Sequence, residues 1–468
     1  MLKYLLALAL CIPAPQSFAQ EPNTVQVINH GVAAFQKRFE MIERAQKSID
    51  VEYFIYNTDE AGRLFTQALI KKKIQNPEVQ IRILLDASGT VLQLKDSYIS
   101  MIESFGIEIR YYNPISLLMH FSKAQYRDHR KLIVIDSQEA ITGSRNIADE
   151  YFDLHPKFNF RDRDIWVSGP IARTMKDSFD EYWAGDQTFE GPKLTSVHTS
   201  KKLREVKKAE DYVIENAHDR FLRSEIKRVG DPILADPRSQ GTCDSLSYVT
   251  DRSGFQTPAK RKVLPKLFGR LNEMKEGDKL YIESPYFIIH DKDAFDEMAN
   301  LKGKNISAVL LTNSLASTDA FYVAANFYPR TSFYQSLSHS QMYIFEGKTP
   351  DNTPFVKMED GTVLTKDAVW GIHSKTFVFS DSSFAIGTFN IDPRSANLNS
   401  EMLMFCEGSK ALTSFVVSDM EARITQADLL GEDGKLSDGK SIFDGVGVMK
   451  KIKFVLAILP SEWFSYLL

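Results

Sequence analysis

Residues 129–136 read HRKLIVID, and GSRN follows at 143–146. Residues 373–380 read HSKTFVFS, and GTFN follows at 387–390. The histidine, the lysine, the glycine, the hydroxyl residue and the asparagine each recur 244 positions later (373 minus 129), without a gap. Two other histidines stand two residues before a lysine, but neither is followed by both an apolar run and a Gly-Ser/Thr-x-Asn segment. The repeated pattern therefore predicts two similar halves.

Strand-like and helix-like segments alternate around both motifs, which predicts an α/β fold. In the first half we predict helices at 31–48, 59–73 and 98–105 and strands at 49–56, 79–86 and 107–112. In the second half we predict helices at 263–274 and 295–301 and strands at 279–289, 307–312 and 342–346. The chain divides into a signal peptide (1–19), a first half (20–195), a charged connector or insertion (196–262), a second half (263–430) and a tail (431–468).

Side chains two residues apart on a strand face the same way. His129 and Lys131 are therefore expected to share a face, as are His373 and Lys375. The turn after each strand adds a hydroxyl and an amide, and these phosphate-binding candidates are Ser144, Asn146, Thr388 and Asn390. Pairing the halves would give two imidazoles flanking a phosphate that two lysines and two asparagines hold.

This set of groups is sufficient for a two-step displacement at phosphorus. One neutral histidine attacks and forms a phosphohistidine, while the other, protonated, donates to the leaving alcohol and then deprotonates the acceptor. Lysine and asparagine stabilise the phosphoryl oxygens, a role that a metal ion has in other enzymes. No cluster of carboxylates has metal-ligand spacing, so we expect an enzyme without a metal or another cofactor.

Each catalytic histidine is expected to need a carboxylate that fixes its tautomer. Glu401, 28 residues after His373, is the candidate in the second half. Asp162 or Asp164 is the candidate in the first half, for His129. The alternative is that these are ordinary charges at strand ends.

Asp136 lies five residues after Lys131, so it is expected on the opposite face of the strand, in a structural role. Ser380 stands where the second half should have an aspartate, and Asp381, one position late, would face the wrong side without a bulge. We expect this substitution to weaken local packing without abolishing the chemistry.

The paired motifs resemble the phospholipase D superfamily, whose signature His-x-Lys-x4-Asp-x6-Gly-Ser-x-Asn occurs twice in monomeric members. Segments that look like bacterial cardiolipin synthases of the class C type are IESPYF at 282–287, LTNSLASTD at 311–319, GTFNIDPRS at 387–395 and LPSEW at 459–463. The resemblance implies two pseudo-twofold-related halves, each a mixed sheet flanked by helices, that share one active site within a monomer. It also implies that His129 is the nucleophile, that His373 is the general acid, and that a phosphatidyl group passes from a phospholipid donor to phosphatidylglycerol, giving cardiolipin.

Three other functions stay open. A secreted phospholipase D would use the same residues to hand the phosphatidyl group to water, releasing phosphatidic acid. A metal-independent nuclease of the same superfamily is disfavoured because 57 basic and 61 acidic residues give a net charge of −4, whereas nucleic-acid binders usually carry a basic surplus. No nucleic-acid partner is therefore expected. An inactive membrane-binding scaffold would account for Ser380 but not for the other site positions, which are intact in both halves.

The first residues resemble a secretory signal, with Lys3, an apolar run at 4–12 and SFA at 17–19. The run is far shorter than the roughly 20 residues that span a bilayer. We therefore expect an exported protein, periplasmic or secreted, that associates peripherally with the membrane; the alternative is an uncleaved N-terminal anchor. Cys243 and Cys406 do not make a disulfide framework and are expected to be unpaired.

The tail combines cations with apolar and aromatic residues. Lys450, Lys451 and Lys453 border an apolar run at 454–459, and Trp463 follows. Positions 452, 455, 456 and 459 would share one face of a helix, which is typical of a membrane-interface helix. The alternative is a terminal helix that docks on the protein core.

Overall fold

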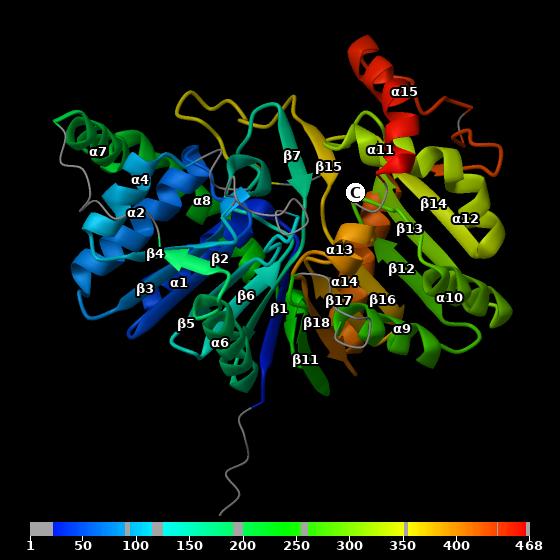
Figure 1. The fold of residues 1–468 in the computed structure, drawn as a ribbon, viewed down its shortest axis with the longest axis horizontal. Coiled ribbons are helices and arrows are strands. Elements are labelled where there is room, and N and C mark those ends of the chain that lie inside the picture. The colour runs from blue at the N-terminus through cyan, green and yellow to red at the C-terminus, as the bar shows by residue number, and fades with distance from the viewer. Residues whose placement is uncertain are drawn as a thin grey trace, which may run out of the picture.

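The computed structural model describes residues 22–88, 94–114, 125–190, 200–253, 261–350, 354–437 and 439–464. The expected signal peptide at 1–19 lies outside these residues. The described chain forms two lobes side by side, each built on one large mixed sheet that helices flank (Figure 1). The predicted α/β fold in two similar halves is confirmed.

The first lobe contains a sheet of nine strands within the described residues, in the order β10-β1-β8-β6-β5-β2-β3-β4-β9. The strands are β1 (Thr24–Ile28), β2 (Ser48–Tyr53), β3 (Gln80–Asp86), β4 (Glu108–Tyr112), β5 (Leu132–Ile135), β6 (Glu139–Gly143), β8 (Asp164–Ser168), β9 (Thr188–Glu190) and β10 (Gln240–Gly241). β2, β3 and β4 are parallel to each other, and the remaining pairs are antiparallel. The flanking helices are α1 (Gly31–Arg44), α2 (Glu60–Gln75), α4 (Asp96–Ser104) and α6 (Pro170–Trp183).

The second lobe repeats this plan. Its sheet has eight strands in the described part of the chain, in the order β11-β18-β17-β16-β12-β13-β14-β19. The strands are β11 (Ser245–Thr250), β12 (Lys279–Glu283), β13 (Ser307–Asn313), β14 (His339–Phe345), β16 (Thr376–Ser380), β17 (Ser383–Gly387), β18 (Met402–Glu407) and β19 (Ala427–Leu430). The helices are α9 (Val263–Glu273), α10 (Lys292–Gly303), α11 (Phe321–Phe327), α12 (Thr331–Leu337), α13 (Pro393–Asn397) and α14 (Lys410–Ile424). Except for β10, every strand of the first sheet has a counterpart at the same place in this order.

The residues between the two motif-bearing halves are more ordered than a charged connector. They form α7 (Ser200–Val213) and α8 (Ala217–Leu234), and α8 begins with a capping box between Asn216 and Asp219. Leu222, Ile226 and Val229 of α8 are buried in the core of the first lobe. β10 then joins the first sheet and β11 joins the second.

The strand after each motif is apolar because both of its faces are covered. In β5, Ile133 lies in the core of the first lobe, whereas Leu132 and Val134 lie in a core that also contains Val378 and Met402 of the second lobe. This shared core fixes the two sheets against each other and thereby positions the loops at their common edge.

Cys243 and Cys406 form a disulfide, with their Cα atoms 5.5 Å apart. The expectation that they are unpaired was therefore wrong. Cys243 precedes β11 and Cys406 lies in the adjacent strand β18, so strand pairing brings together two residues that lie 163 positions apart in the sequence.

Candidate active site

The first histidine sits where the two lobes meet. Asp128 forms an isolated β-bridge with Ser400 of the second half, and the backbone N–H of His129 donates to the Ser400 carbonyl oxygen at 3.2 Å. The His129 Nδ1 atom lies 3.0 Å from each carboxylate oxygen of Glu401. Glu401 therefore belongs to His129, not to His373 as the sequence suggested.

The second histidine mirrors the first. β15 (Val369–Ile372) pairs in parallel with β7 (Phe158–Arg161) of the first half, and the His373 N–H donates to the Arg161 carbonyl oxygen at 3.0 Å. The His373 Nδ1 atom lies 2.9 Å from Asp162 Oδ1. Asp162 and Glu401 each contact a histidine, but the predicted pairing within each half was wrong because the segments cross over between the lobes.

Asp164, the alternative candidate, is not part of the histidine pair. Its Oδ2 atom lies 2.8 Å from Arg38 Nη1 and 3.3 Å from Arg145 Nη1, and all three side chains are buried. Asp164 therefore neutralises two buried arginines within the first lobe.

Hydroxyl and amide donors surround the Glu401 carboxylate. Thr388 Oγ1 donates at 2.6 Å, Ser395 Oγ at 2.7 Å and Asn399 Nδ2 at 3.3 Å. The Thr388 hydroxyl also accepts the Met402 N–H at 2.9 Å. Sequence reasoning missed Ser395 and Asn399, which lie between the repeated motif ending at Asn390 and Glu401.

The hydroxyl group of Ser144, the counterpart of Thr388, also has hydrogen-bond partners within the chain. Its hydroxyl accepts the N–H of Arg163 at 3.2 Å and donates to the carbonyl oxygen of the same residue at 3.3 Å. Since Arg163 follows Asp162, each hydroxyl of the repeated motif holds the segment that carries an orienting carboxylate. Phosphate binding by Ser144 and Thr388 stays a prediction.

The two lysines precede the strands on which they were expected, because β5 begins at Leu132 and β16 at Thr376. Lys131 Nζ donates to the carbonyl oxygen of His129 at 2.7 Å, and Lys375 Nζ donates to that of His373 at 2.5 Å. Burial and the charge of Lys375 lower the pKa of Lys131 to about 7. Burial also lowers the pKa of Lys375 to about 8. The electrostatic interaction between the lysines indicates that the two half-sites converge.

Burial favours the neutral form of both imidazoles. Burial lowers the pKa of His129 to about 4, although Glu401 acts in the opposite direction. Burial and then Lys375 lower the pKa of His373. Burial disfavours an ionised Glu401, but His129 and the hydrogen bonds to the carboxylate hold its pKa below the usual value. Each neutral ring therefore donates Nδ1–H to an ionised carboxylate, which leaves Nε2 with a lone pair for nucleophilic or base chemistry.

The two motif asparagines are buried. Asn146 Oδ1 accepts the N–H of Ile55 at 3.1 Å. Asn390 Oδ1 has no hydrogen-bond partner among the described residues. A buried carbonyl oxygen without a partner costs free energy unless a ligand or water donates to it, so the Asn390 Oδ1 atom is suited to accept a hydrogen bond from a substrate hydroxyl group.

Aromatic side chains enclose both imidazoles. The Phe54 ring packs edge-on against His129 with the ring centroids 5.2 Å apart. Tyr151 and Phe160 lie with their ring centroids 5.4 and 4.7 Å from that of His373. These rings cover part of each buried histidine, and no motif in the sequence singled them out.

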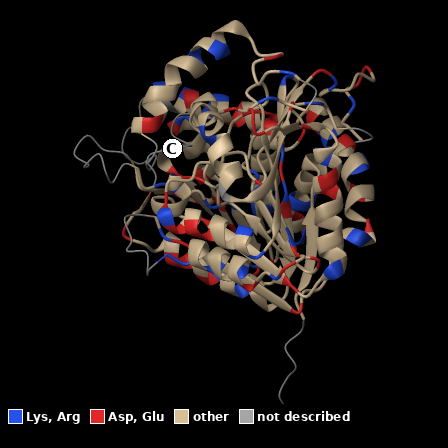
Figure 2. Cartoon of the chain, turned by 90° about the vertical axis from the view of Figure 1, so that its right-hand side faces the viewer, with Lys and Arg blue, Asp and Glu red and all other residues tan. Residues whose placement is uncertain are grey.

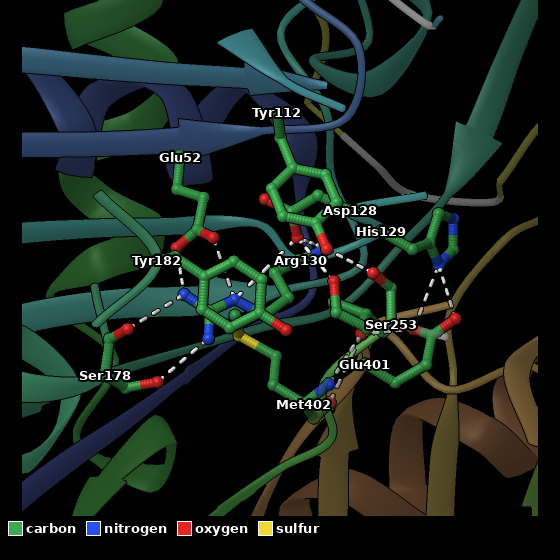
Figure 3. A network of polar contacts seen from close by, with 12 residues as sticks. Glu52, Tyr112, Asp128, His129, Arg130, Ser178, Tyr182, Ser253, Glu401 and Met402 are labelled. Carbon is green, nitrogen blue, oxygen red and sulfur yellow. Dashed lines mark hydrogen bonds and ion pairs between the residues drawn. The ribbon is translucent and has the colours of Figure 1, made fainter. Parts of the chain in front are cut away.

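Buried ion pairs and hydrogen bonds hold the residues on either side of His129 in place. Arg130, between His129 and Lys131, donates to Glu52 of β2 at 2.8 and 2.5 Å and to the Ser178 hydroxyl at 2.9 Å (Figure 3). Asp128 accepts a hydrogen bond of 2.7 Å from the Ser400 hydroxyl. Burial, followed by the charge of Glu52, raises the pKa of Asp128 well above its usual value.

On the other side, Arg163 crosses between the lobes. Its Nη1 atom lies 2.8 Å from Glu283 Oε2 on β12 and 2.6 Å from Thr376 Oγ1. Arg423 of α14 contacts the other oxygen of Glu283 at 2.5 Å. These contacts fix the first-lobe segment that carries Asp162 against the second sheet.

Asp136 stands apart from this centre. Its carboxylate accepts the N–H groups of Gln46, Lys47 and Ser48 at 2.8, 2.7 and 2.7 Å and so fixes the start of β2. The Ser380 hydroxyl accepts the N–H of Ser382 at 3.3 Å. Asp381 is exposed and pairs with Lys410 at 2.8 Å.

The described residues contain no group of three or more histidine, cysteine, aspartate and glutamate side chains arranged to hold a metal ion. What they contain instead is a duplicated centre of two histidines, two lysines and two crossed carboxylates. The fold and the site therefore define a class of protein: a duplicated α/β protein in which both halves contribute residues to one centre.

Comparison with known proteins identifies the family within this class. Residues 39–183 and 270–422 match the family model described as "Cardiolipin synthase, PLD-like domain". The chain belongs to this family, and the resemblance indicated by the motifs is confirmed.

Relatives align over most of the chain. Cardiolipin synthase C of Escherichia coli (strain K12) is 27% identical over 390 residues, which cover 79% of this chain and 78% of the relative. An uncharacterized protein of Helicobacter pylori (strain ATCC 700392 / 26695) is 29% identical over 392 residues, covering 80% and 74%. The crystal structure of phosphatidylserine synthase from Haemophilus influenzae Rd KW20 superposes with a TM-score of 0.66, covering 95% of each chain at 13% identity. This last likeness concerns the fold alone.

Proposed function

We propose that this chain is a phosphatidyl transferase that makes cardiolipin from phosphatidylglycerol and a phospholipid donor through a phosphohistidine. The observation that carries the proposal is the pair of buried contacts between His129 and Glu401 and between His373 and Asp162. Membership of the cardiolipin synthase, PLD-like family supports the choice of substrates.

His129 acts as the nucleophile in this proposal. Its pKa of about 4 keeps the ring neutral over the physiological range. Nε2 attacks phosphorus, a P–N bond forms, and the P–O bond to the donor's head-group alcohol breaks. Glu401 stabilises the positive charge that develops on the His129 ring.

His373 moves the proton. A bound phosphodiester anion favours its protonated form, and that form gives its proton to the leaving oxygen. The neutral ring then takes a proton from a hydroxyl of phosphatidylglycerol, whose oxygen attacks phosphorus as the P–N bond breaks. Lys131, Lys375, Asn146 and Asn390 stabilise the phosphoryl oxygens in both steps.

The test is to incubate the purified protein with phosphatidylglycerol vesicles and identify the products by mass. Cardiolipin and a released head group are expected, whereas phosphatidic acid alone would identify a hydrolase. His129→Ala and His373→Ala should each abolish turnover. The matched control is His218→Ala, since His218 is a partly exposed histidine paired with Glu60 on the surface. Full turnover by either catalytic variant would refute the assignment.

We also propose that the protein works outside the cytoplasm. The Cys243–Cys406 disulfide supports this location, because disulfides persist in oxidising compartments. N-terminal sequencing of protein recovered from the periplasm or medium of a Gram-negative host should give a chain that begins near Gln20. Recovery of full-length protein only in the cytoplasm would contradict the proposal.

A further inference from the structure

The last helix, α15 (Val448–Trp463), is attached to the second lobe by one face. Phe454 is buried and packs its ring against those of Tyr328 and Phe443, at centroid distances of 6.2 and 5.3 Å. Asn326 Nδ2 of α11 donates to the Ser461 carbonyl oxygen at 3.0 Å. These contacts fix the helix on α11, at the edge of the molecule (Figure 1).

The opposite face of α15 is apolar and open to solvent. Its large side chains have exposed fractions between 47% and 78%, and they are Ile452, Val455, Leu456, Leu459 and Trp463. Scattered exposed apolar residues are normal, but a contiguous ordered row of them marks an interaction surface. The exposed face contains the four positions that the sequence pattern assigned to one side of a helix.

Basic residues border this apolar face on both sides. At about 100° per residue, Lys451 and Lys453 project to either side of Ile452. In the view of Figure 2, α15 lies at the upper margin of the molecule, with its basic positions in blue. An apolar stripe between two lysines, ending in a tryptophan, is the pattern of a helix that lies in the headgroup region of an anionic bilayer.

The helix also contacts the edge of the sheet where the catalytic residues lie. Lys450 Nζ donates to the carbonyl oxygens of Ala316 and Thr318, at 3.1 and 2.8 Å. Both carbonyls belong to the loop after β13, which continues into Asp319. Asp319 accepts a hydrogen bond of 3.0 Å from the Tyr286 hydroxyl. Asn313, which ends β13 before this loop, donates from Nδ2 to the carbonyl oxygen of Ile372, next to His373, at 2.7 Å.

We infer that α15 is an interfacial helix that docks the enzyme on an anionic phospholipid bilayer, with its apolar face inserted and Lys451 and Lys453 bound to lipid phosphates. The inference rests on the proposed function, for which it supplies the partner surface. Because the base of α15 is bonded to the Asp319 loop, a bilayer bound by the helix lies beside the active site. Sixteen residues rise about 24 Å, less than the roughly 30 Å hydrocarbon core, so α15 lies along the surface.

Binding is measured by flotation with vesicles of phosphatidylcholine alone and with vesicles of phosphatidylcholine that contain about 30 mol% phosphatidylglycerol, whose anionic surface attracts basic residues. We expect association with the anionic vesicles that weakens in high salt. Trp463 provides a direct signal because it is 78% exposed, whereas Trp183 and Trp370 are buried. Its fluorescence should shift to the blue on anionic vesicles, and Trp463→Phe should remove the shift.

The decisive variant carries Val455→Glu, Leu456→Glu and Leu459→Glu. It should bind anionic vesicles at least ten-fold more weakly than the unchanged protein, because three apolar anchors become anionic. The matched control is the double variant Ile74→Glu and Leu203→Glu, which changes exposed apolar residues on helices of the first lobe. Equal vesicle binding by the triple variant and the control would overturn the inference. A concentration-dependent dimer that the triple variant loses, without vesicle binding, would also overturn it by identifying a second copy as the occupant.

Activity separates this inference from the proposed function. The triple variant should lose at least ten-fold activity on vesicles but keep full activity on a short-chain phosphatidylglycerol below its critical micelle concentration. Vesicle binding that depends on α15 in a protein that makes no cardiolipin would refute the proposed function alone. Equal activity of the triple variant and the unchanged protein on vesicles would refute the docking role of α15 alone.

Discussion

Glu401→Gln tests the crossed arrangement of the site most directly. Glutamine keeps the size of the side chain and removes one negative charge 3.0 Å from His129 Nδ1. At an effective dielectric constant of about 20, the attraction between this carboxylate and an imidazolium is roughly 5 kcal/mol. That energy corresponds to a loss of about 10³- to 10⁴-fold in kcat if Glu401 stabilises the charged His129 ring in the transition state.

The assay uses a phosphatidyl donor with p-nitrophenol as the leaving group, in excess over the enzyme, and follows nitrophenolate release before the steady state. Nitrophenolate leaves without an acid, so the burst reports phosphohistidine formation alone. Glu401→Gln should abolish the burst, because its partner His129 is the nucleophile. Asp162→Asn should keep the burst and block the second step, because its partner His373 is the acid and base.

Glu139→Gln is the matched control, since Glu139 is a mostly buried glutamate bound to Arg44 and Trp166. It should leave both phases unchanged. A burst that survives Glu401→Gln and disappears in Asp162→Asn would show that the carboxylates serve the opposite histidines, or that the histidines have the opposite roles. Activity of Glu401→Gln within ten-fold of the unchanged enzyme would refute the electrostatic argument itself.

Three further predictions concern binding and stability. Burial lowers the pKa of Lys131 to about 7 and that of Lys375 to about 8, so both lose their protons as pH rises from 7 to 9. The affinity for the anion tungstate, measured by calorimetry, should therefore fall by up to about ten-fold per pH unit for each lysine. An affinity that stays constant over this range would contradict the prediction. Reduction of the Cys243–Cys406 disulfide, which links residues 163 positions apart, should lower the free energy of unfolding in urea by up to about 5 kcal/mol, with an unchanged unfolding midpoint as the contrary result. Asp136→Ala removes the acceptor of three backbone N–H groups and should lower the free energy of unfolding by about 2–3 kcal/mol. The kcat of the folded enzyme should stay the same. A large loss of kcat would make Asp136 part of the catalytic machinery.

The sequence predicted the elements that local patterns encode. The duplicated motif located both histidines and both lysines, and the hydrophobic runs located most of the strands around them. β5 and β16 nevertheless begin one residue after Lys131 and Lys375. The residues before each strand bond to the other half instead, and a contact of this kind has no signal in local periodicity.

Long-range pairing accounts for the remaining differences. Glu401 lies 28 residues after His373 and 272 residues from His129, so proximity in sequence favoured the wrong partner. Cys243 and Cys406 meet only because β11 pairs with β18. The Lys- and Glu-rich composition of α7 obscured a helix whose charged side chains form i,i+3 and i,i+4 pairs, such as Lys207 with Glu210 and Asp211.

The exchange of carboxylates makes catalysis a property of the interface between the halves. A half with its own histidine and lysine but without the other half's carboxylate would hold a buried imidazole whose charged form nothing stabilises. Burial lowers the pKa of both histidines, so the positive charge that each ring must carry in turn depends on an anion from the opposite lobe. Any opening between the lobes therefore separates His129 from Glu401 and His373 from Asp162 together, and both steps of the reaction should fail at once.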